Sequence, residues 1–259
     1  MELKKVYTLH ETDKAANLFD GWEETLIWSC LQGVMGKIRV TDTDCPSAAC
    51  ARQGCFFFYA GNPERELVLD PFSGFAIMTP QNDEWAKLIM ECFPSARRAT
   101  RYAIKKNTRF DTDKLERMAG TLPKGYEMKA IDSELYDMCL NDPMTEDFVS
   151  VFDNKEQFLR LGRGIVITKN GKIVSGASSY SRYREGIEIE VDTVPEERRK
   201  HLATAAASSL ILNCLKEGLY PSWDAHNMAS VRLAEKLGYE FSHEYPVYEV
   251  LHDVQGKRG

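Results

Sequence analysis

Residues 187 to 207 change from an alternating pattern to a helical one within a few positions. Three carboxylates, Glu188, Glu190 and Asp192, alternate with apolar residues at positions 187, 189 and 191. This period of two predicts a strand with one apolar and one acidic face. Pro195 ends the strand, and an alanine-rich helix is expected over about residues 198–217. A strand that leads directly into a helix restricts the chain to folds that contain both kinds of element.

Three basic residues, Arg198, Arg199 and Lys200, stand where the predicted helix begins. The first backbone N–H groups of a helix have no partner within the helix, and with the helix dipole they form an anion site. Small residues follow, beginning with Ala203, so a bulky phosphorylated ligand has room to approach the backbone. The same residues are also typical of an ordinary basic start to a packing helix, and both interpretations stay open at this point.

The C-terminal half predicts a mixed sheet. Its expected elements are a strand, two helices, three antiparallel strands, a helix, a strand, a helix and further strands, in turn at residues 126–131, 133–162, 164–168, 173–183, 186–194, 198–217, 221–225, 227–237 and 239–250. Asn170-Gly171 predicts a tight hairpin, because this pair accepts the positive φ angles of a type I′ turn. The order favours a mixed α/β (α+β) sheet over a repeating βαβ fold.

The N-terminal half also alternates helices and strands. Helices are expected at 11–32, 81–93 and 113–118, and strands at 53–60, 75–78 and 98–105. Residues 122–125, Leu-Pro-Lys-Gly, form the linker candidate. Residues 1–122 are therefore predicted to form an N-terminal α/β domain and residues 123–259 a second domain, the first being interpreted as a diverged copy of the second.

Two segments of the C-terminal half resemble the GNAT superfamily of N-acetyltransferases. Arg198 to Ala203 is similar to motif A of that family, Arg/Gln-x-x-Gly-x-Gly/Ala, and Asn227 to Tyr239 resembles motif B, Asn-x-x-Ala-x-x-Leu-Tyr-Glu-Lys-Leu-Gly-Phe. Residues 218–227 also resemble the bacterial branch that includes zwittermicin-resistance acetyltransferases. The resemblance implies the GNAT acyl-CoA N-acyltransferase fold for residues 123–259, and it covers the N-terminal half only loosely.

The resemblance also implies a site for acetyl-CoA, which serves as co-substrate. The end of the 187–193 strand would hold the acetyl group and pantetheine arm by backbone pairing, main-chain N–H groups of 199–204 would hold the diphosphate, and Asn227 would contact the arm. The implied cofactor residues are Val191, Asp192, Thr193, Arg198, Arg199, Lys200, His201, Leu202, Ala203, Thr204 and Asn227.

Two residues depart from the family pattern. His201 adds a side chain where the family has Gly, and it is expected either to obstruct the diphosphate or to point outward and add a donor. Ala234 stands in place of the Tyr that, in the family, protonates the leaving thiolate. The candidates for a replacement acid are Tyr180, Tyr183, Tyr220 and His226.

Transfer of an acyl group to an amine also needs a base that deprotonates the ammonium. Neighbouring like charges raise the pKa of a carboxylate, which suits this role. Glu190 is therefore the first candidate for the catalytic base and Glu188 the second. The same acidic face is also typical of a strand that faces solvent, and this alternative stays open.

The sequence predicts an N-acetyltransferase that moves the acetyl group of acetyl-CoA to a primary amine of a small molecule by direct attack in a ternary complex. The alternative is a catalytically weak or inactive acyl-CoA-binding protein of the same fold, which His201 and Ala234 support. A third hypothesis is an interaction module whose N-terminal half recruits a partner. That half is otherwise expected either to close over the acceptor pocket or to form a homodimer surface.

Composition argues against several other classes. A net charge of −6 is unsuited to nucleic-acid binding, which needs a basic face. The seven cysteines include no C-x-x-C pair, so no metal is expected. A polar N-terminus and short apolar runs predict neither a signal peptide nor a membrane span, and a cytoplasmic location is expected.

Overall fold

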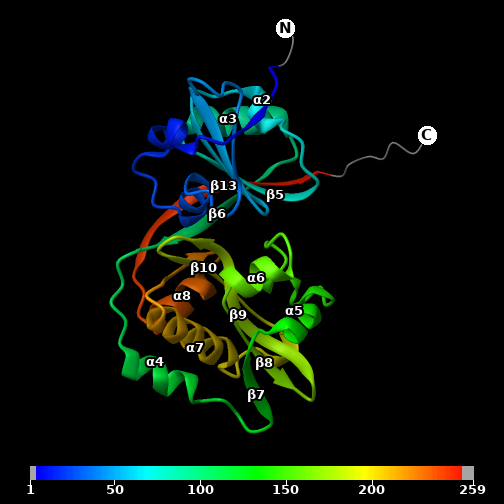
Figure 1. Cartoon of the computed structure of the whole chain (residues 1–259), viewed down its shortest axis with the longest axis vertical. Coiled ribbons are helices and arrows are strands. Elements are labelled where there is room, and N and C mark those ends of the chain that lie inside the picture. Colours follow the sequence, from blue (N-terminus) through cyan, green and yellow to red (C-terminus); the bar gives the residue numbers. More distant parts are fainter. Residues whose placement is uncertain (1–3, 253–259) are drawn as a thin grey trace, which may run out of the picture. The chain divides into compact units, whose positions relative to one another are not determined.

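The computed structural model describes residues 4–252, which fold into two compact units (Figure 1). The first unit contains residues 4–101 and 244–252, and the second is Tyr102–His243. This division differs from the predicted boundary at residues 122 and 123, because α4 (Thr112–Ala119) buries Leu115 in the core of the second unit. The last strand, β13 (Phe241–His252), in addition passes from the second unit back into the first.

The first unit contains a sheet with the strand order β1-β2-β3-β4-β5-β13-β6. Its strands and helices, besides β13, are β1 (Tyr7–Leu9), η1 (Thr12–Phe19), α1 (Thr25–Leu31), β2 (Lys37–Val40), β3 (Ala48–Gln53), β4 (Phe56–Gly61), α2 (Arg65–Val68), β5 (Gly74–Pro80), α3 (Asp83–Cys92) and β6 (Arg97–Ile104). Tyr59, Met78 and Trp85 are fully buried in its core, which holds α3 against the sheet.

The second unit contains a five-stranded sheet in the order β11-β10-β9-β8-β7. Its elements, besides α4, are β7 (Tyr126–Ala130), α5 (Ser133–Leu140), η2 (Glu146–Phe148), α6 (Lys155–Leu161), β8 (Gly164–Lys169), β9 (Lys172–Tyr183), β10 (Gly186–Thr193), η3 (Pro195–Glu197), α7 (Leu202–Lys216), β11 (Tyr220–Ser222), β12 (Asp224–Ala225) and α8 (Met228–Leu237). Asn170 and Gly171 have φ angles of 51° and 77°, which confirms the predicted type I′ hairpin between β8 and β9.

The five-stranded sheet separates two groups of helices (Figure 1). Ala177 and Ile189 share a buried cluster with Leu210 of α7 on one face. Ser178 points to the opposite face, where its hydroxyl donates to the carbonyl of Phe148 in η2 at 2.6 Å. Because neighbouring strand residues alternate between faces, the apolar side of β10 faces α7 and its acidic side faces η2.

The two units repeat one plan, and the mixed α/β fold predicted from the sequence is confirmed. In the second unit, antiparallel β8, β9 and β10 are followed by α7 and by β11, which runs parallel to β10. In the first unit, antiparallel β2, β3 and β4 are followed by α2 and by β5, which runs parallel to β4. However, α2 has 4 residues where α7 has 15. Among the described residues, a long helix between the antiparallel strands and the following parallel strand is therefore found in the second unit.

Candidate functional site

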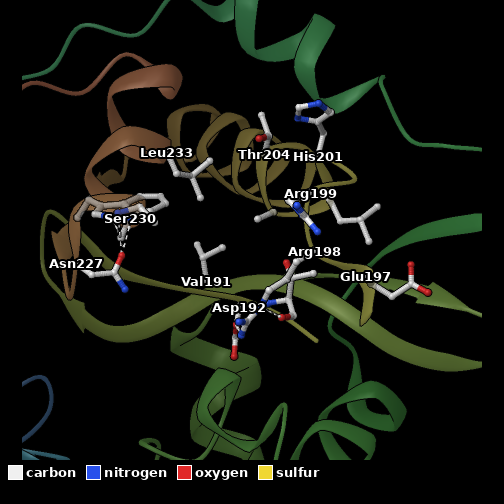
Figure 2. Close-up of a pocket in the computed structure, with 15 residues that line it drawn as sticks. Val191, Asp192, Glu197, Arg198, Arg199, His201, Thr204, Asn227, Ser230 and Leu233 are labelled. Carbon is white, nitrogen blue, oxygen red and sulfur yellow. Dashed lines mark hydrogen bonds and ion pairs between the residues drawn. The ribbon is translucent and has the colours of Figure 1, made fainter. Parts of the chain in front are cut away.

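A pocket of about 530 Å³ lies in the second unit, where β10 ends and α7 and α8 begin (Figure 2). Its volume is within the range of sites that hold small organic ligands. All of the cofactor residues predicted from the sequence line it except Lys200. The lining consists of Val191, Asp192, Thr193, Glu197, Arg198, Arg199, His201, Leu202, Ala203, Thr204, Trp223, Asn227, Ala229, Ser230 and Leu233.

The pocket opens where β10 loses its neighbour. β10 pairs in parallel with β11 through its first three residues, Gly186 to Glu188. The chain then turns away at Trp223, and β12 pairs with Tyr102 and Ala103 of β6 instead. The predicted strand at 221–225 is thus split between two sheets. As a result, the backbone of β10 beyond Glu188 has an edge that is not covered by β11, and Val191 to Thr193 line the pocket along this edge.

The loop before α7 holds two residues in the left-handed region. Arg199 and His201 have φ angles of 63° and 65°, a conformation that costs residues other than Gly about 1 kcal/mol or more. The helix therefore begins at Leu202 and not at the predicted residue 198. Its first internal bond runs from Ala205 N to the carbonyl of His201 at 3.0 Å, and no side chain caps it. The amides of Leu202, Ala203 and Thr204 thus begin the helix without intrahelical partners, the arrangement that favours an anion.

The basic side chains of this loop do not all face the pocket. Arg198 turns back to the strand, where its Nε donates to the carbonyl of Thr193 at 3.0 Å and its guanidinium lies 3.8 Å from Asp192. Lys200 does not line the pocket and pairs with Glu197 at 2.6 Å. Arg199 is therefore the arginine of this loop that is least engaged with its own strand.

His201 lines the pocket but does not fill it. Its side chain is exposed, and in Figure 2 its ring lies on the far side of the loop from Asp192. Its Nδ1 is 3.3 Å from the Nζ of Lys236 in α8, and that same Nζ donates to Thr204 Oγ1 at 3.5 Å. Lys236 thus adds a positive charge beside the first turn of α7. Because it comes from the far end of α8, sequence reasoning about the loop missed it.

The partly buried carboxylate of Glu197 anchors the loop to the hairpin side of the sheet. Glu197 accepts hydrogen bonds from Lys169 at 2.8 Å, from Lys200 at 2.6 Å and from the hydroxyl of Tyr126. The hydrogen bonds from Lys169, Lys200 and Tyr126 lower the pKa of Glu197 to about 2. Since Tyr126 and Lys169 lie far away in the sequence, no local pattern could have identified this anchor.

Replacing Glu197 with Gln is expected to loosen the loop and to lower the melting temperature at neutral pH, because Lys169 and Lys200 lose their charged acceptor. The Glu197 carboxylate has its pKa depressed from 4.5, so its contribution to stability is present above about pH 4.5 and is lost as the pH falls through about 2. The difference in melting temperature between wild type and Glu197→Gln should therefore be constant above pH 4.5 and shrink toward pH 2. A difference that persists unchanged at pH 2 would contradict this assignment.

The start of α8 closes the other end of the pocket. Asn227 caps the helix, its Oδ1 accepting from the amides of Ala229 and Ser230 at 2.9 and 3.0 Å. Asn227 is therefore the N-cap of α8, and His226 before it is exposed. The indole N–H of Trp223 donates to the hydroxyl of Ser230 at 3.0 Å. This end is polar but carries no charge among its lining residues Asn227, Ser230 and Trp223.

The two candidate bases lie outside the pocket lining, on the acidic face of β10. Glu190 is partly exposed, whereas Glu188 is only 4% exposed. Asp147 of η2 is near this face, since partial burial and the charge of Asp192 raise the pKa of Asp147. The strand thus presents carboxylates to the η2 side while its end lines the pocket, so an amine on that side would meet negative charge.

None of the candidate acids lines the pocket. Tyr183 is buried with its hydroxyl 3.0 Å from that of Ser222, and burial raises its pKa. Tyr220 accepts from the amide of Thr108 at 3.1 Å. Tyr180 and His226 are likewise absent from the lining. Ala234 is fully buried in the core beside α7, so the family's position for a tyrosine is filled here by a packing residue.

Two further properties concern metals and membranes. Among residues 4–252, no group of three or more His, Cys, Asp and Glu side chains is arranged to hold a metal ion. The cysteines of this part of the chain are free thiols, and Cys45, Cys50 and Cys55 differ in burial from exposed to fully buried. The helices described here are too short or too polar to span a bilayer.

Comparison with known proteins shows the family to which the chain belongs. A family model described as GNAT acetyltransferase matches residues 16–248. The "Uncharacterized N-acetyltransferase YdfB" of Bacillus subtilis strain 168 is 30% identical over 131 residues, which is 49% of each chain, so the match spans about half the length of this curated relative.

Solved structures extend the likeness over nearly the whole chain. A GCN5-related N-acetyltransferase-like protein from Streptococcus suis 89/1591 is 47% identical, with a TM-score of 0.88 over 93% of this chain and 98% of that one. A tandem GNAT protein from the clavulanic acid biosynthesis pathway is 10% identical, with a TM-score of 0.53 over 95% and 98% of the two chains, and shows the fold alone.

Proposed function

The chain belongs to the GNAT acetyltransferase family, and from this premise we propose that it transfers the acetyl group of acetyl-CoA to a primary amine of a small molecule by direct attack in a ternary complex. The observation that carries the proposal is the pocket formed by the open edge of β10 and the uncapped first turn of α7. One wall offers the β10 backbone edge that β11 leaves uncovered and the other offers helix amides, which suits a ligand with both amide and diphosphate groups.

The residues present fit coenzyme A. The amides of Leu202, Ala203 and Thr204, with Arg199 and Lys236 beside them, would hold the diphosphate. The backbone of Val191 would pair with the amides of the pantetheine arm, next to Asp192 and Thr193, whose backbone groups already bind Arg198, Ser175 and the Asp192 carboxylate. When bound, acetyl-CoA supplies an activated acyl group, and the chain's own groups orient the acyl carbon and exclude water from it.

The acidic face of β10 supports the choice of an amine as acceptor. Asp147, Glu190 and Asp192 gather negative charge on the η2 side, which attracts an ammonium group. We propose that Glu190 takes the proton of the attacking amine, directly or through water, with Glu188 as the second candidate. The resemblance of residues 218–227 to zwittermicin-resistance enzymes favours an aminopolyol or amino-acid-like acceptor as the finer proposal.

Binding of acetyl-CoA is the direct test. At a ligand concentration of 100 times Kd, the folded protein gains about 2.7 kcal/mol, so the melting temperature should rise by several degrees. Incubation with a panel of primary amines should then give N-acetylated product and free thiol in equal amounts. The absence of any thermal shift and of any heat of binding would contradict the proposal.

The alternative is a protein that binds acyl-CoA but is catalytically weak or inactive, and Ala234 is the observation that favours it. Since Ala234 is buried and carries no donor, the usual proton source is missing. Saturable binding of coenzyme A without turnover across the amine panel would favour this alternative, whereas rapid turnover of one amine would exclude it.

A further inference from the structure

The two ends of the pocket differ in chemistry. Figure 2 shows Arg199 and His201 at one end, Asn227 and Ser230 at the other, with Val191 between them. The end at α7 has helix amides and positive side chains, which suit a diphosphate. The end at α8 has an amide and a hydroxyl but no charge. A ligand with a diphosphate at one end and a thioester at the other is therefore oriented with its thioester toward α8.

Ser230 is held in place at this end by two hydrogen bonds. Its amide donates to the Oδ1 of Asn227 at 3.0 Å, and its Oγ accepts from the indole N–H of Trp223 at 3.0 Å. The indole itself is fixed, because Trp223 is 3% exposed and its ring packs against that of Tyr239 at 5.6 Å. The Trp223 carbonyl also accepts from Lys106 at 3.0 Å.

The indole hydrogen bond determines which role remains for the Ser230 hydroxyl. An indole N–H is a donor only, so in this contact the serine oxygen is the acceptor. The O–H of Ser230 is then left to act as a donor, and Ser230 lines the pocket. Ser230 lies one helical turn before Ala234, on the face of α8 that also presents Leu233. The hydroxyl of Ser230 is thus near residue 234, where the family has a tyrosine and this chain has a buried alanine without a donor.

We propose that Ser230 donates a hydrogen bond to the sulfur of the acyl donor, with Trp223 as its positioning residue. This rests on the proposed function. As the amine nitrogen bonds to the carbonyl carbon and the carbon–sulfur bond breaks, the electron pair moves to sulfur and the amine proton to the base. Ser230 stabilises the growing negative charge and keeps its own proton, because an aliphatic hydroxyl is a weaker acid than a thiol.

The test measures the thiol pKa of bound coenzyme A from its ultraviolet thiolate absorbance as a function of pH. A hydrogen bond to a charged group is strong enough to shift a pKa by about one pH unit. The pKa of the bound thiol should thus rise by about one unit in Ser230→Ala and return toward the wild-type value in Ser230→Thr, which keeps the hydroxyl. Trp223→Phe, which removes the indole N–H, should give a partial rise.

Ser208→Ala is the matched control, since Ser208 is fully buried in α7, outside the pocket, and its hydroxyl has no hydrogen-bond partner. It should leave the thiol pKa unchanged. Wild-type protein that binds coenzyme A with the same thiol pKa as Ser230→Ala would overturn this inference and leave the proposed function intact. Wild-type protein that binds no coenzyme A would overturn both.

Discussion

Glutamate in place of Ala203 is expected to reduce the affinity for coenzyme A about 100-fold or more. Ala203 is the second residue of α7, is partly exposed and lines the pocket. A carboxylate there would stand among the amides proposed to hold the diphosphate. Like charges placed in contact cost several kcal/mol, and each 1.4 kcal/mol corresponds to about tenfold in Kd.

The fold should tolerate the Ala203→Glu change. An acidic residue in the first turn of a helix interacts favourably with the helix dipole, and α7 has no acidic residue there. The melting temperature without ligand should therefore stay the same or rise slightly, while the rise produced by coenzyme A disappears. Isothermal titration calorimetry and thermal denaturation measure the two effects separately.

Ala130→Glu is the matched control for this prediction. Ala130 is exposed at the end of β7 and does not line the pocket, so the same chemical change there should leave the affinity nearly unchanged. Equal loss of affinity in both variants would point to a general charge effect, and no loss in Ala203→Glu would exclude the α7 amides as the diphosphate site.

Sequence patterns predicted the strands of the second unit well, because these strands depend on short-range signals. Alternation in β10 and the Asn170-Gly171 pair place three consecutive strands within a residue or two of their observed bounds. The aromatic run at 53–60 predicts a strand, which β4 (Phe56–Gly61) confirms, but the strand starts three residues later than predicted because Gly54, with φ 54°, forms the turn between β3 and β4.

Two further predictions were wrong, the first for a local reason and the second for a long-range one. The expected helix at 11–32 is interrupted, since η1 ends at Phe19 and α1 begins at Thr25, with a positive φ at Gly21 between them. The strand at 221–225 is split at Trp223 because β11 and β12 pair with strands of different sheets. Residue preference over a few positions contains no information about such partners.

The pocket was predictable as far as its residues are neighbours in the sequence. The loop before α7 and Asn227 were identified from motifs, and they line the pocket. The late start of α7 was missed, because Arg199 and His201 adopt left-handed φ angles without glycine to signal it. The partners of Glu197, the contact from Lys236 and the Trp223–Ser230 pair depend on tertiary packing. None of these has a local sequence signal.

Replacing Glu190 with Gln is expected to lower kcat about 100-fold, the lower end of what general base catalysis contributes. Glu190 is partly exposed on the η2 face of β10, so it is accessible to an acceptor amine and to water. Because it lies outside the pocket lining, the Kd for coenzyme A should not change. Steady-state kinetics with saturating acetyl-CoA, together with calorimetry, separate the two quantities.

Glu188→Gln is the control that decides between the two candidate bases. Glu188 is on the same strand and face but is only 4% exposed, and it pairs in register with Ser181 and Ser222. Loss of this buried group should lower the melting temperature more than Glu190→Gln does, and should lower kcat less.

The pH profile gives the second criterion, since removal of the base should flatten the acidic limb of kcat/KM in Glu190→Gln alone. If the limb flattens in Glu188→Gln instead, the base is Glu188, and if it flattens in neither, the amine loses its proton to another group or to solvent.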